Sequence, residues 1–215
     1  MDLIAADRHL SSCDPVMNHL VNTHGPCGLT ADPATPFAAL VRAITHQQLH
    51  GKAAATILGR LCARFPRQRL PTAAELLKVP VEALRADGFS GSKAAALHDL
   101  AAKTLEGVVP PARVLTILSD DEIVARLIAV RGVGRWTVEM MLMFRLGRPD
   151  VWPTDDFGVR NGYAIAYGLP IMPTAKVLLP LGEPYRPWRS VAAWYLWRAA
   201  DAAKVSSSAK KSKNF

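Results

Sequence analysis

The sequence predicts an all-α protein, and three observations support this class. Apolar residues recur every three or four positions along most of the chain, for example over residues 37–44. Helix-start signals are frequent: Thr35 stands before Pro36, and Thr72–Glu75 and Ser119–Glu122 have the composition of capping boxes. The chain shows no run of alternating β-branched residues and no hairpin dipeptide between two such runs, so nothing predicts a strand.

The apolar periods and the caps place the helices in order. Pro15 opens the second half of the first helix, and Thr154 and Thr174 are expected to cap two helices nearer the C-terminus. Longer helices are expected over residues 1–20, 52–65, 90–107 and 187–204, and from Pro36 into the polar cluster 46–50. A short helix is expected over 81–86 and a further one over 123–129, with others after Thr72, Gly134, Thr154 and Thr174. Residues 1–204 are expected to form one domain, and the polar, basic residues 205–215 a disordered tail.

Length and composition bound the function classes. The chain has 215 residues, 50% hydrophobic and 20% charged, enough for one sizeable domain or for two small lobes that share a core. A net charge of +8 favours an anionic partner, either nucleic acid or a membrane surface. No strongly basic amphipathic helix supports the membrane alternative.

Cysteine usage and the N-terminus indicate the compartment. Cys13, Cys27 and Cys62 are widely spaced and form no CxxC pair, which argues against zinc and iron–sulfur sites and fits a reducing environment. The N-terminus has acidic residues where a signal peptide has a basic start, and no apolar stretch is long enough to span a bilayer. We therefore expect a cytoplasmic protein, or a nuclear one if the source is eukaryotic.

Residues 128–144 are the stretch around which the rest of the chain is organised. Gly132 and Gly134 predict a tight hairpin between two helices and permit close approach to the backbone. The second helix begins with free N–H groups and a partial positive charge, which favours a bound phosphate. A second Gly/Ser-rich turn, Gly88–Lys93, opens another helix. It is either a second phosphate site to which Lys93 adds charge, or an ordinary Ser-capped helix.

Two adjacent carboxylates, Asp155 and Asp156, follow the hairpin in the loop 151–157. With Thr154 as the cap, both fall in the first helical turn, where an acid favours the helix dipole without further function. Beside a phosphate-binding hairpin they have a second interpretation, because a carboxylate can stabilise positive charge that develops in a reaction, or activate water. The other ligands expected around a metal are missing.

Two further groups also have both a structural and a functional interpretation. The Gln and His residues at 46–50 are either a solvated turn between helices or a polar finger that enters a groove. Trp136, Phe157 and Trp197 are either core residues or the walls of a box for a flat, cationic guest.

Together these motifs resemble the helix-hairpin-helix DNA glycosylases, and in particular the 3-methyladenine DNA glycosylase II branch, which repairs alkylated bases. The resemblance rests on residues 36–49, 131–137 and 153–157, and on Pro187–Ser190 followed by Trp197. It implies two helical lobes with the active cleft between them. The chain is similar to the compact form, without the N-terminal β domain of larger bacterial members.

The resemblance implies roles for individual residues. Asp156 matches the catalytic aspartate by position, although the Pro-to-Asp spacing of some relatives selects Asp155. Gln47 and Gln48 match the wedge that fills the gap left by the extruded nucleotide, and His50 a position that reaches the minor groove. The base pocket is expected to comprise Trp136, Met140, Phe157 and Trp197. The DNA-contacting set is expected to comprise Gln47, Gln48, His50, Ser90, Ser92, Lys93, Gly132, Gly134, Arg135 and Thr137.

The implied activity is that of a monofunctional glycosylase without a lyase step, because Trp136 stands where lyase-competent relatives place the Schiff-base lysine. The implied partner is duplex DNA that contains alkylated bases, bound by a monomer. No cofactor is required, and the backbone carbonyls of Ile128, Val130 and Gly132 are expected to hold a monovalent cation, Na⁺ or K⁺. The alternatives are a glycosylase for another class of lesion and a hairpin module that only binds DNA.

Overall fold

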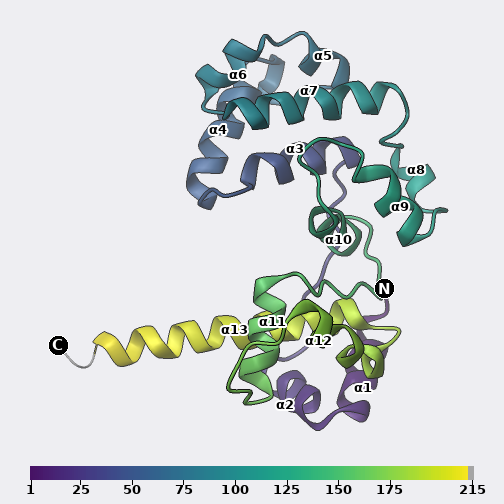
Figure 1. Cartoon of the computed structure of the whole chain (residues 1–215), viewed down its shortest axis with the longest axis vertical. Coiled ribbons are helices and arrows are strands. Elements are labelled where there is room, and N and C mark those ends of the chain that lie inside the picture. Colours follow the sequence, from purple (N-terminus) through teal and green to yellow (C-terminus); the bar gives the residue numbers. More distant parts are fainter. Residues whose placement is uncertain (213–215) are drawn as a thin grey trace. The chain divides into compact units, whose positions relative to one another are not determined.

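The computed structural model describes the backbone of residues 1–212 and the side chains of residues 1–205 (Figure 1). Over this part of the chain the backbone forms thirteen α-helices and two 3-10 helices and contains no strand, which confirms the all-α prediction. None of these helices is both long enough and apolar enough to cross a lipid bilayer. The chain divides into two compact units, as the prediction of two helical lobes implied.

Unit 1 comprises Met1–Ala31 together with the chain from Leu142 onward. Its long helix α13 (Arg189–Ser212) packs mainly against α11 and also against α1 and α2 (Figure 1). The buried side chains of this unit include Leu10, Met17, Tyr185 and Tyr195. The other helices of this unit are α1 (Leu3–Cys13), α2 (Pro15–His24), α11 (Phe157–Ala166), α12 (Ala175–Leu181) and η2 (Glu183–Tyr185).

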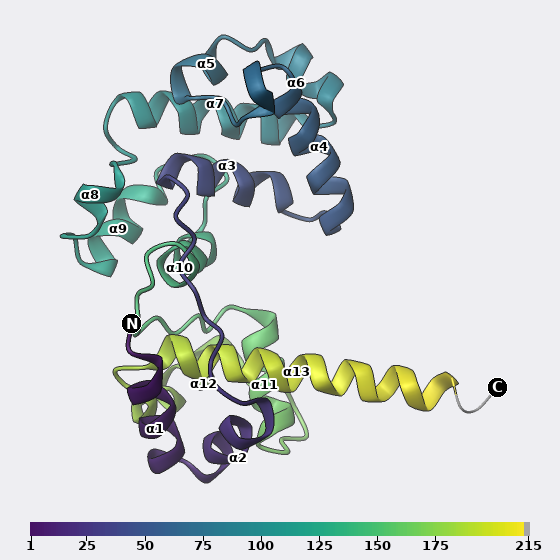
Figure 2. The same ribbon diagram turned by 180° about the vertical axis from the view of Figure 1, so that it is seen from behind.

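Unit 2 comprises Asp32–Met141. Its centre is α7, which packs against α3, α5 and α6 (Figure 2). The buried side chains of α3 and α7 include Leu40, Ile44, Leu97 and Leu100. The helices of this unit are α3 (Pro36–His46), α4 (Gly51–Ala63), η1 (Pro66–Gln68), α5 (Ala73–Leu77), α6 (Val81–Asp87), α7 (Gly91–Leu105), α8 (Ala112–Leu115) and α9 (Asp120–Leu127). The helix α10 (Arg135–Phe144) begins in unit 2, and its last three residues, Leu142–Phe144, belong to unit 1.

The helix ends show where local signals were sufficient. The predicted start of α3 is confirmed, because the Thr35 side chain accepts the Ala38 N–H as its cap, and the helix ends at His46, the first residue of the predicted polar cluster. The single helix expected over residues 1–20 is instead two helices, because Asp14 caps α2 by accepting the N–H groups of Val16 and Met17. The last helix continues to Ser212, beyond its expected end at Lys204. The remainder of the expected tail, residues 213–215, lies outside the described residues.

Candidate functional site

The predicted hairpin joins α9 to α10 in unit 2. Gly132 adopts a φ of 76°, a conformation that favours glycine, whereas Gly134 does not need a positive φ. The requirement for glycine in the turn therefore falls on Gly132 alone. A Cβ atom added to Gly134 would meet nothing within 4 Å, so the backbone there is open to an approaching molecule. The turn closes with the Val133 N–H donating to the Val130 carbonyl at 3.0 Å.

A carboxylate on α7 anchors this hairpin. Asp99 accepts the backbone N–H of Arg131 at 2.7 Å and forms an ion pair with Lys103. Burial by itself raises the pKa of the Asp99 carboxyl, but the Arg131 N–H and the Lys103 ammonium outweigh it and lower that pKa below its usual value. The backbone of the hairpin is thus fixed to α7, the central helix of unit 2, by the hydrogen bond from the Arg131 N–H to Asp99.

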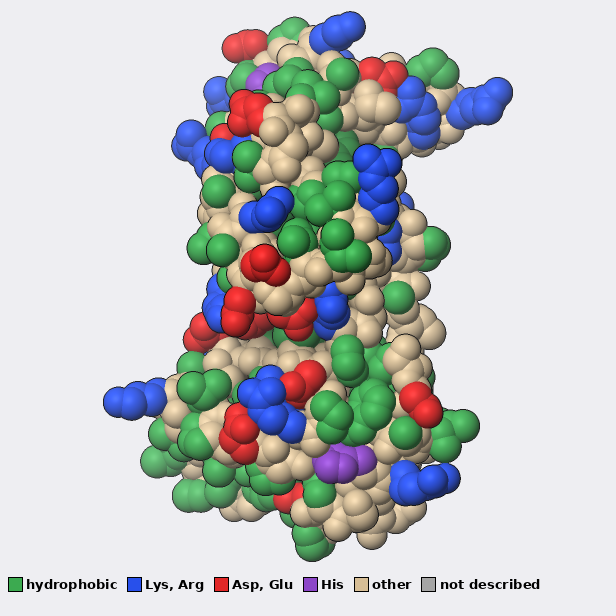
Figure 3. Space-filling view, turned by 90° about the vertical axis from the view of Figure 1, so that its right-hand side faces the viewer, with side chains coloured by type: hydrophobic (Ala, Val, Ile, Leu, Met, Phe, Trp, Pro, Cys, Tyr) green, Lys and Arg blue, Asp and Glu red, His purple; other side chains and the backbone are tan. Residues whose placement is uncertain are grey.

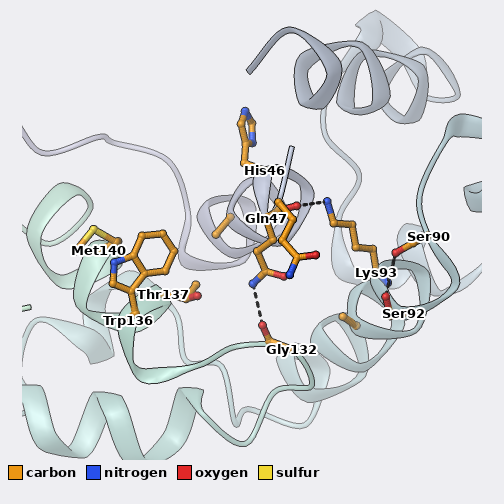
Figure 4. Close-up of a pocket in the computed structure, with 12 residues that line it drawn as sticks. His46, Gln47, Ser90, Ser92, Lys93, Gly132, Trp136, Thr137 and Met140 are labelled. Carbon is orange, nitrogen blue, oxygen red and sulfur yellow. Dashed lines mark hydrogen bonds between the residues drawn. The ribbon is translucent and has the colours of Figure 1, made fainter. Parts of the chain in front are cut away.

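A pocket of about 740 Å³ opens beside the hairpin within unit 2. Figure 4 shows Trp136, Thr137 and Met140 on one side, Ser90, Ser92 and Lys93 on the other, and Gln47 between the two groups. The predicted residues that line the pocket are Gln47, Gln48, Ser90, Ser92, Lys93, Gly132, Trp136, Thr137 and Met140. Residues that the sequence assigned to two separate roles, base pocket and DNA contact, therefore share one cavity.

The two adjacent glutamines, Gln47 and Gln48, lie in different environments. The Gln47 side chain donates from Nε2 to the Gly132 carbonyl at 2.8 Å, so it is tied to the hairpin. Gln48 is exposed and adopts a φ of 55°, which is uncommon for any residue other than glycine. Strained, exposed backbone of this kind often occurs at binding sites. Of the two, Gln48 therefore fits an inserting role, and Gln47 supports the hairpin.

The second Gly/Ser-rich turn is a capped helix start in this structure. The Ser90 side chain accepts the Lys93 N–H, and the hydroxyls of Ser90 and Ser92 lie 3.0 Å apart. The Lys93 ammonium donates to the carbonyls of Thr45 and Gln47, each at 2.7 Å. Burial lowers the pKa of Lys93 below its usual value. Its side chain is directed at the end of α3.

The remaining predicted DNA contacts lie around the pocket. His50 is the exposed N-cap residue of α4 and makes no side-chain capping bond, so its ring is available to a partner. Arg135 lies 3.6 Å from Glu139 and 3.9 Å from Asp121. His46 belongs to the predicted polar cluster 46–50 but not to the predicted DNA-contacting set. It lines the pocket, and its Nδ1 lies 2.8 Å from the Arg42 carbonyl.

In unit 1 the two adjacent aspartates, Asp155 and Asp156, differ in their exposure to solvent. Asp156 is only 9% exposed, whereas Asp155 is exposed to solvent. Asp156 is itself the N-cap of α11 and accepts the Val159 N–H at 2.8 Å. The expectation that Thr154 caps this helix was therefore wrong, because a turn from Pro153 to Asp156 delays its start. The cap bond holds the carboxylate at the positive end of the helix.

Trp197 makes the second contact to this carboxylate. Its indole Nε1 donates to Asp156 Oδ1 at 2.8 Å. The approach requires Gly158, where an added Cβ would lie only 2.7 Å from Trp197 Cδ1. The Phe144 ring stacks on the Trp197 ring, with the two ring centroids 5.6 Å apart and the ring planes at 23° to each other. Phe157, which the sequence placed in the same box, is 65% exposed.

Phe144 is a residue that the sequence analysis missed. A usable signal existed, because Phe144 follows Met140 by four residues, just as Met140 follows Trp136. A spacing of four predicts one helical face, and two of the three positions had already been assigned to the base pocket.

The loop that carries Asp156 is anchored on both sides. Arg189 forms a two-pronged ion pair with Asp150, with distances of 2.7 and 3.0 Å. The buried Ser190 hydroxyl accepts the Val151 N–H and donates to the Arg148 carbonyl. Trp152 is buried and donates from Nε1 to the Leu178 carbonyl at 3.0 Å. These bonds connect the loop to α12 and α13 and so fix the position of the carboxylate.

Charged side chains are dispersed over one face of the molecule (Figure 3). On the face shown in Figure 3, Lys and Arg side chains alternate with acidic and hydrophobic ones and form no single basic patch. Among the described residues, no group of three or more His, Cys, Asp and Glu side chains could hold a metal ion. The arrangement can bind a phosphate backbone at the hairpin and can stabilise positive charge at Asp156.

Comparisons with known proteins agree with these features. Residues 41–183 match the family model described as HhH-GPD superfamily base excision DNA repair protein. DNA-3-methyladenine glycosylase 1 of Schizosaccharomyces pombe is 37% identical over 214 residues, which cover 99% of this chain and 94% of that protein. The alkylbase DNA glycosidase-like protein mag2 of the same organism is 35% identical over 92% of this chain and 93% of that protein.

Solved structures show the same similarity. The S. pombe 3-methyladenine DNA glycosylase in complex with abasic DNA superposes with a TM-score of 0.82 and 39% identity, covering 90% of this chain and 95% of that one. A DNA-3-methyladenine glycosidase from Bacillus halodurans also gives 0.82, with 31% identity over 91% of this chain and 88% of that one. On its sequence and its helical fold, this chain belongs to the HhH-GPD superfamily of base excision DNA repair proteins.

Proposed function

We propose that the protein is a DNA glycosylase that removes alkylated purines of the 3-methyladenine and 7-methylguanine class from duplex DNA. The single observation that carries the proposal is the Asp156 carboxylate, which is nearly buried and held by the Val159 N–H and the Trp197 indole. The names of two relatives with which this chain aligns over most of its length, DNA-3-methyladenine glycosylase 1 and the B. halodurans glycosidase, support the same substrate class.

The proposed reaction begins with DNA binding. The hairpin N–H groups and the start of α10 hold a phosphate, and the exposed Gln48 enters the stack as the damaged nucleotide turns out. Turning a base out of the duplex costs about a few kcal/mol, and less where alkylation has weakened its pairing. Aromatic side chains favour a flat, positively charged guest, and the Trp197 ring lies beside the Asp156 carboxylate.

The chemical step is hydrolysis of the N-glycosidic bond. An alkylated purine already carries positive charge, so it departs with the bonding electrons as a neutral base and needs little acid catalysis. Positive charge then develops on the sugar, and the fixed carboxylate of Asp156 stabilises it. Water adds to the sugar C1′ and loses a proton, which leaves an abasic site. No step forms a covalent bond to the protein.

We further propose that the enzyme lacks lyase activity and acts as a monomer. Trp136 occupies the first turn of α10, at the position where the resemblance places a Schiff-base lysine in bifunctional relatives. Treatment with borohydride during the reaction is expected to trap no protein–DNA adduct. An adduct at any lysine would contradict this part of the proposal.

A monovalent cation at the hairpin is compatible with the residues present. The Gly132 carbonyl accepts the Gln47 amide and the Val130 carbonyl accepts the Val133 N–H, and each oxygen keeps a second lone pair. We propose that these carbonyls and that of Ile128 hold Na⁺ or K⁺. Such an ion would add positive charge near a bound phosphate and would take no part in bond cleavage.

The deciding test is release of free base from methylated duplex DNA by the parent protein and by Asp156→Asn. Asparagine also caps helices well, so this variant keeps the hydrogen bonds of α11 and removes only the charge. We expect the release of 3-methyladenine to fall by about a hundredfold or more. The control is Asp155→Asn, which makes the same change of charge at the exposed neighbour and is expected to keep the parent rate.

Two outcomes would refute the proposal. If the parent protein binds the duplex and releases no base, it is a DNA-binding module. If Asp156→Asn releases 3-methyladenine at the parent rate while the control is slow, Asp155 is the catalytic residue. Scoring 3-methyladenine, 7-methylguanine and etheno-adenine separately defines the lesion range.

A further inference from the structure

Lys93 joins two segments that are far apart in the sequence. Its ammonium lies 2.7 Å from the carbonyl of Thr45, near the end of α3, and 2.7 Å from that of Gln47, which directly follows α3. Figure 4 shows the contact to Gln47. Carbonyls at a helix C-terminus lack partners within the helix and carry partial negative charge, so a cation satisfies them well. Lys93 lies in the first turn of α7, where its own N–H is bonded to Ser90.

Gln47 continues this chain of contacts to the hairpin. Its carbonyl accepts the ammonium of Lys93, and its side-chain amide donates to the Gly132 carbonyl at 2.8 Å. One residue therefore connects the end of α3, the start of α7 and the hairpin. The next residue, Gln48, is the exposed one with a φ of 55°.

We infer that Lys93 is a positioning residue that holds Gln47 against the hairpin and thereby presents Gln48 to the DNA. This inference rests on the proposed function for the statement that Gln48 enters the duplex. It replaces the expectation that Lys93 neutralises a phosphate. Both carbonyl contacts are short, and the ammonium is partly withdrawn from solvent, as its lowered pKa also indicates.

The two roles of Lys93 differ in a measurable way. A lysine that contacts a phosphate releases counterions on binding, so its loss lowers the slope of log K against log salt by about one. A lysine that holds a protein loop leaves the slope unchanged and weakens binding at every salt concentration. The positioning role also predicts that Lys93 and Gln48 do not contribute independently.

The experiment uses Lys93→Met, Gln48→Ala, their combination, and Lys78→Met as the control. Lys78 is an exposed lysine of the same unit that does not line the pocket, so it matches the loss of charge. Affinity for a duplex with a stable abasic-site analogue is measured over a series of salt concentrations. We expect Lys93→Met to bind about tenfold more weakly with an unchanged slope, as the loss of charge-assisted hydrogen bonds would produce. Adding Gln48→Ala is expected to cause no further loss.

A second measurement needs no DNA and so separates this inference from the proposed function. In the free parent protein, the NMR signals of the Gln47 side-chain amide are expected to exchange slowly with water because Gly132 holds them. In Lys93→Met they are expected to exchange rapidly, and in Lys78→Met to remain slow. Lys93→Arg, which keeps the charge and the donors, is expected to restore part of the protection.

Three results would overturn the inference. They are a salt slope for Lys93→Met that is smaller by about one, losses for Lys93→Met and Gln48→Ala that multiply in the combined variant, and an unchanged Gln47 amide in Lys93→Met. Should Lys93→Met not fold, Gln47→Ala removes only the bond to Gly132. It must then weaken binding at an unchanged slope for the inference to stand.

Discussion

Asp156 has a structural and a chemical role that depend on the same oxygen atom. Oδ1 accepts both the Val159 N–H, which caps α11, and the Trp197 Nε1–H, each at 2.8 Å. Two donors in fixed positions leave the carboxylate little rotational freedom. A preorganised carboxylate stabilises developing charge better than a mobile one, because it needs no rearrangement during the reaction.

Trp197→Phe tests the contribution of the indole donor. Phenylalanine keeps an aromatic ring beside Phe144 and removes the N–H bond to Asp156. A hydrogen bond to a charged group contributes about 1.5 to 3 kcal/mol, so we expect the rate of base release at saturating enzyme to fall by about ten- to a hundredfold. Affinity for abasic-site DNA is expected to stay close to that of the parent.

The combination of the two variants checks this assignment. Because Trp197 acts through Asp156, Trp197→Phe should cause little additional loss in the Asp156→Asn background. A full additional loss there, or a loss confined to DNA affinity, would show that Trp197 serves only as a wall of the pocket.

At the scale of elements, the contact between α11 and α13 depends on two glycines one helical turn apart. Gly158 makes room for the Trp197 ring, and Gly162 lies against the backbone of Leu196. A Cβ at Gly162 would lie only 2.0 Å from the Leu196 carbonyl oxygen, far inside any real contact. The neighbour is backbone in the middle of a helix and cannot move aside.

Gly162→Ala is therefore expected to destabilise unit 1. Overpacking of a well-packed interior costs about 1 to 3 kcal/mol, and a backbone neighbour favours the upper end of that range. The matched control is Gly59→Ala in α4, where an added Cβ meets nothing within 4 Å. Gly59→Ala is expected to leave the melting temperature unchanged or to raise it, because alanine favours the helix by about 0.5 to 1 kcal/mol. Equal melting temperatures for the two variants would contradict the close approach.

Most helices could be predicted because their signals are local. Thr35, Thr72 and Ser119 accept N–H groups three residues ahead, as their sequence context indicated. The start of α11 could not be predicted, because the turn before Asp156 belongs to a loop that is anchored by a distant bond from Trp152 to Leu178. The four-residue helix α8 was also missed, since it is too short to show an apolar period.

The candidate site was predictable as a set of residues but not as a set of contacts. The sequence identified Gln47, Lys93 and Gly132 separately, and only the fold shows that they are joined in one chain of hydrogen bonds. The pairing of Trp197 with Asp156 spans 41 residues and likewise has no local signal. Long-range contacts of this kind depend on how the helices pack. No short sequence pattern indicates which distant residues the packing brings together.

At the scale of the whole molecule, most of the groups that limit stability at alkaline pH belong to unit 1, although burial also raises the pKa of the Cys62 thiol in unit 2. Tyr163, Tyr167, Tyr185 and Tyr195 are the four tyrosines of the chain, and burial raises the pKa of each above the ordinary value. Burial also raises the pKa of the Cys27 thiol, from 9.0 to about 11. Unit 2 contains neither the four tyrosines nor Cys27.

The sign of the linkage follows from these shifts. A group whose pKa is higher in the folded state than in the unfolded state stabilises the fold fully below its unfolded pKa. That stabilisation is lost as the pH rises through the folded pKa. For Cys27 this window extends from about 9 to about 11, and for the tyrosines it begins near their ordinary value of 10. We therefore expect stability to be constant near neutral pH and to fall steeply above about pH 10.

An alkaline titration monitored by the 295 nm absorbance of tyrosinate tests this expectation. In guanidinium chloride all four tyrosines should ionise near pH 10, as exposed phenols do. In the folded protein little absorbance should develop at that pH. It should then appear in one steep step that coincides with loss of helical circular dichroism, because the buried phenols ionise only when unit 1 unfolds. Ionisation of the four tyrosines near pH 10 with the helical signal intact would show that they are solvated. The packing of α13 against α11, on which the position of Asp156 depends, would then be looser than the burial of Tyr195 indicates.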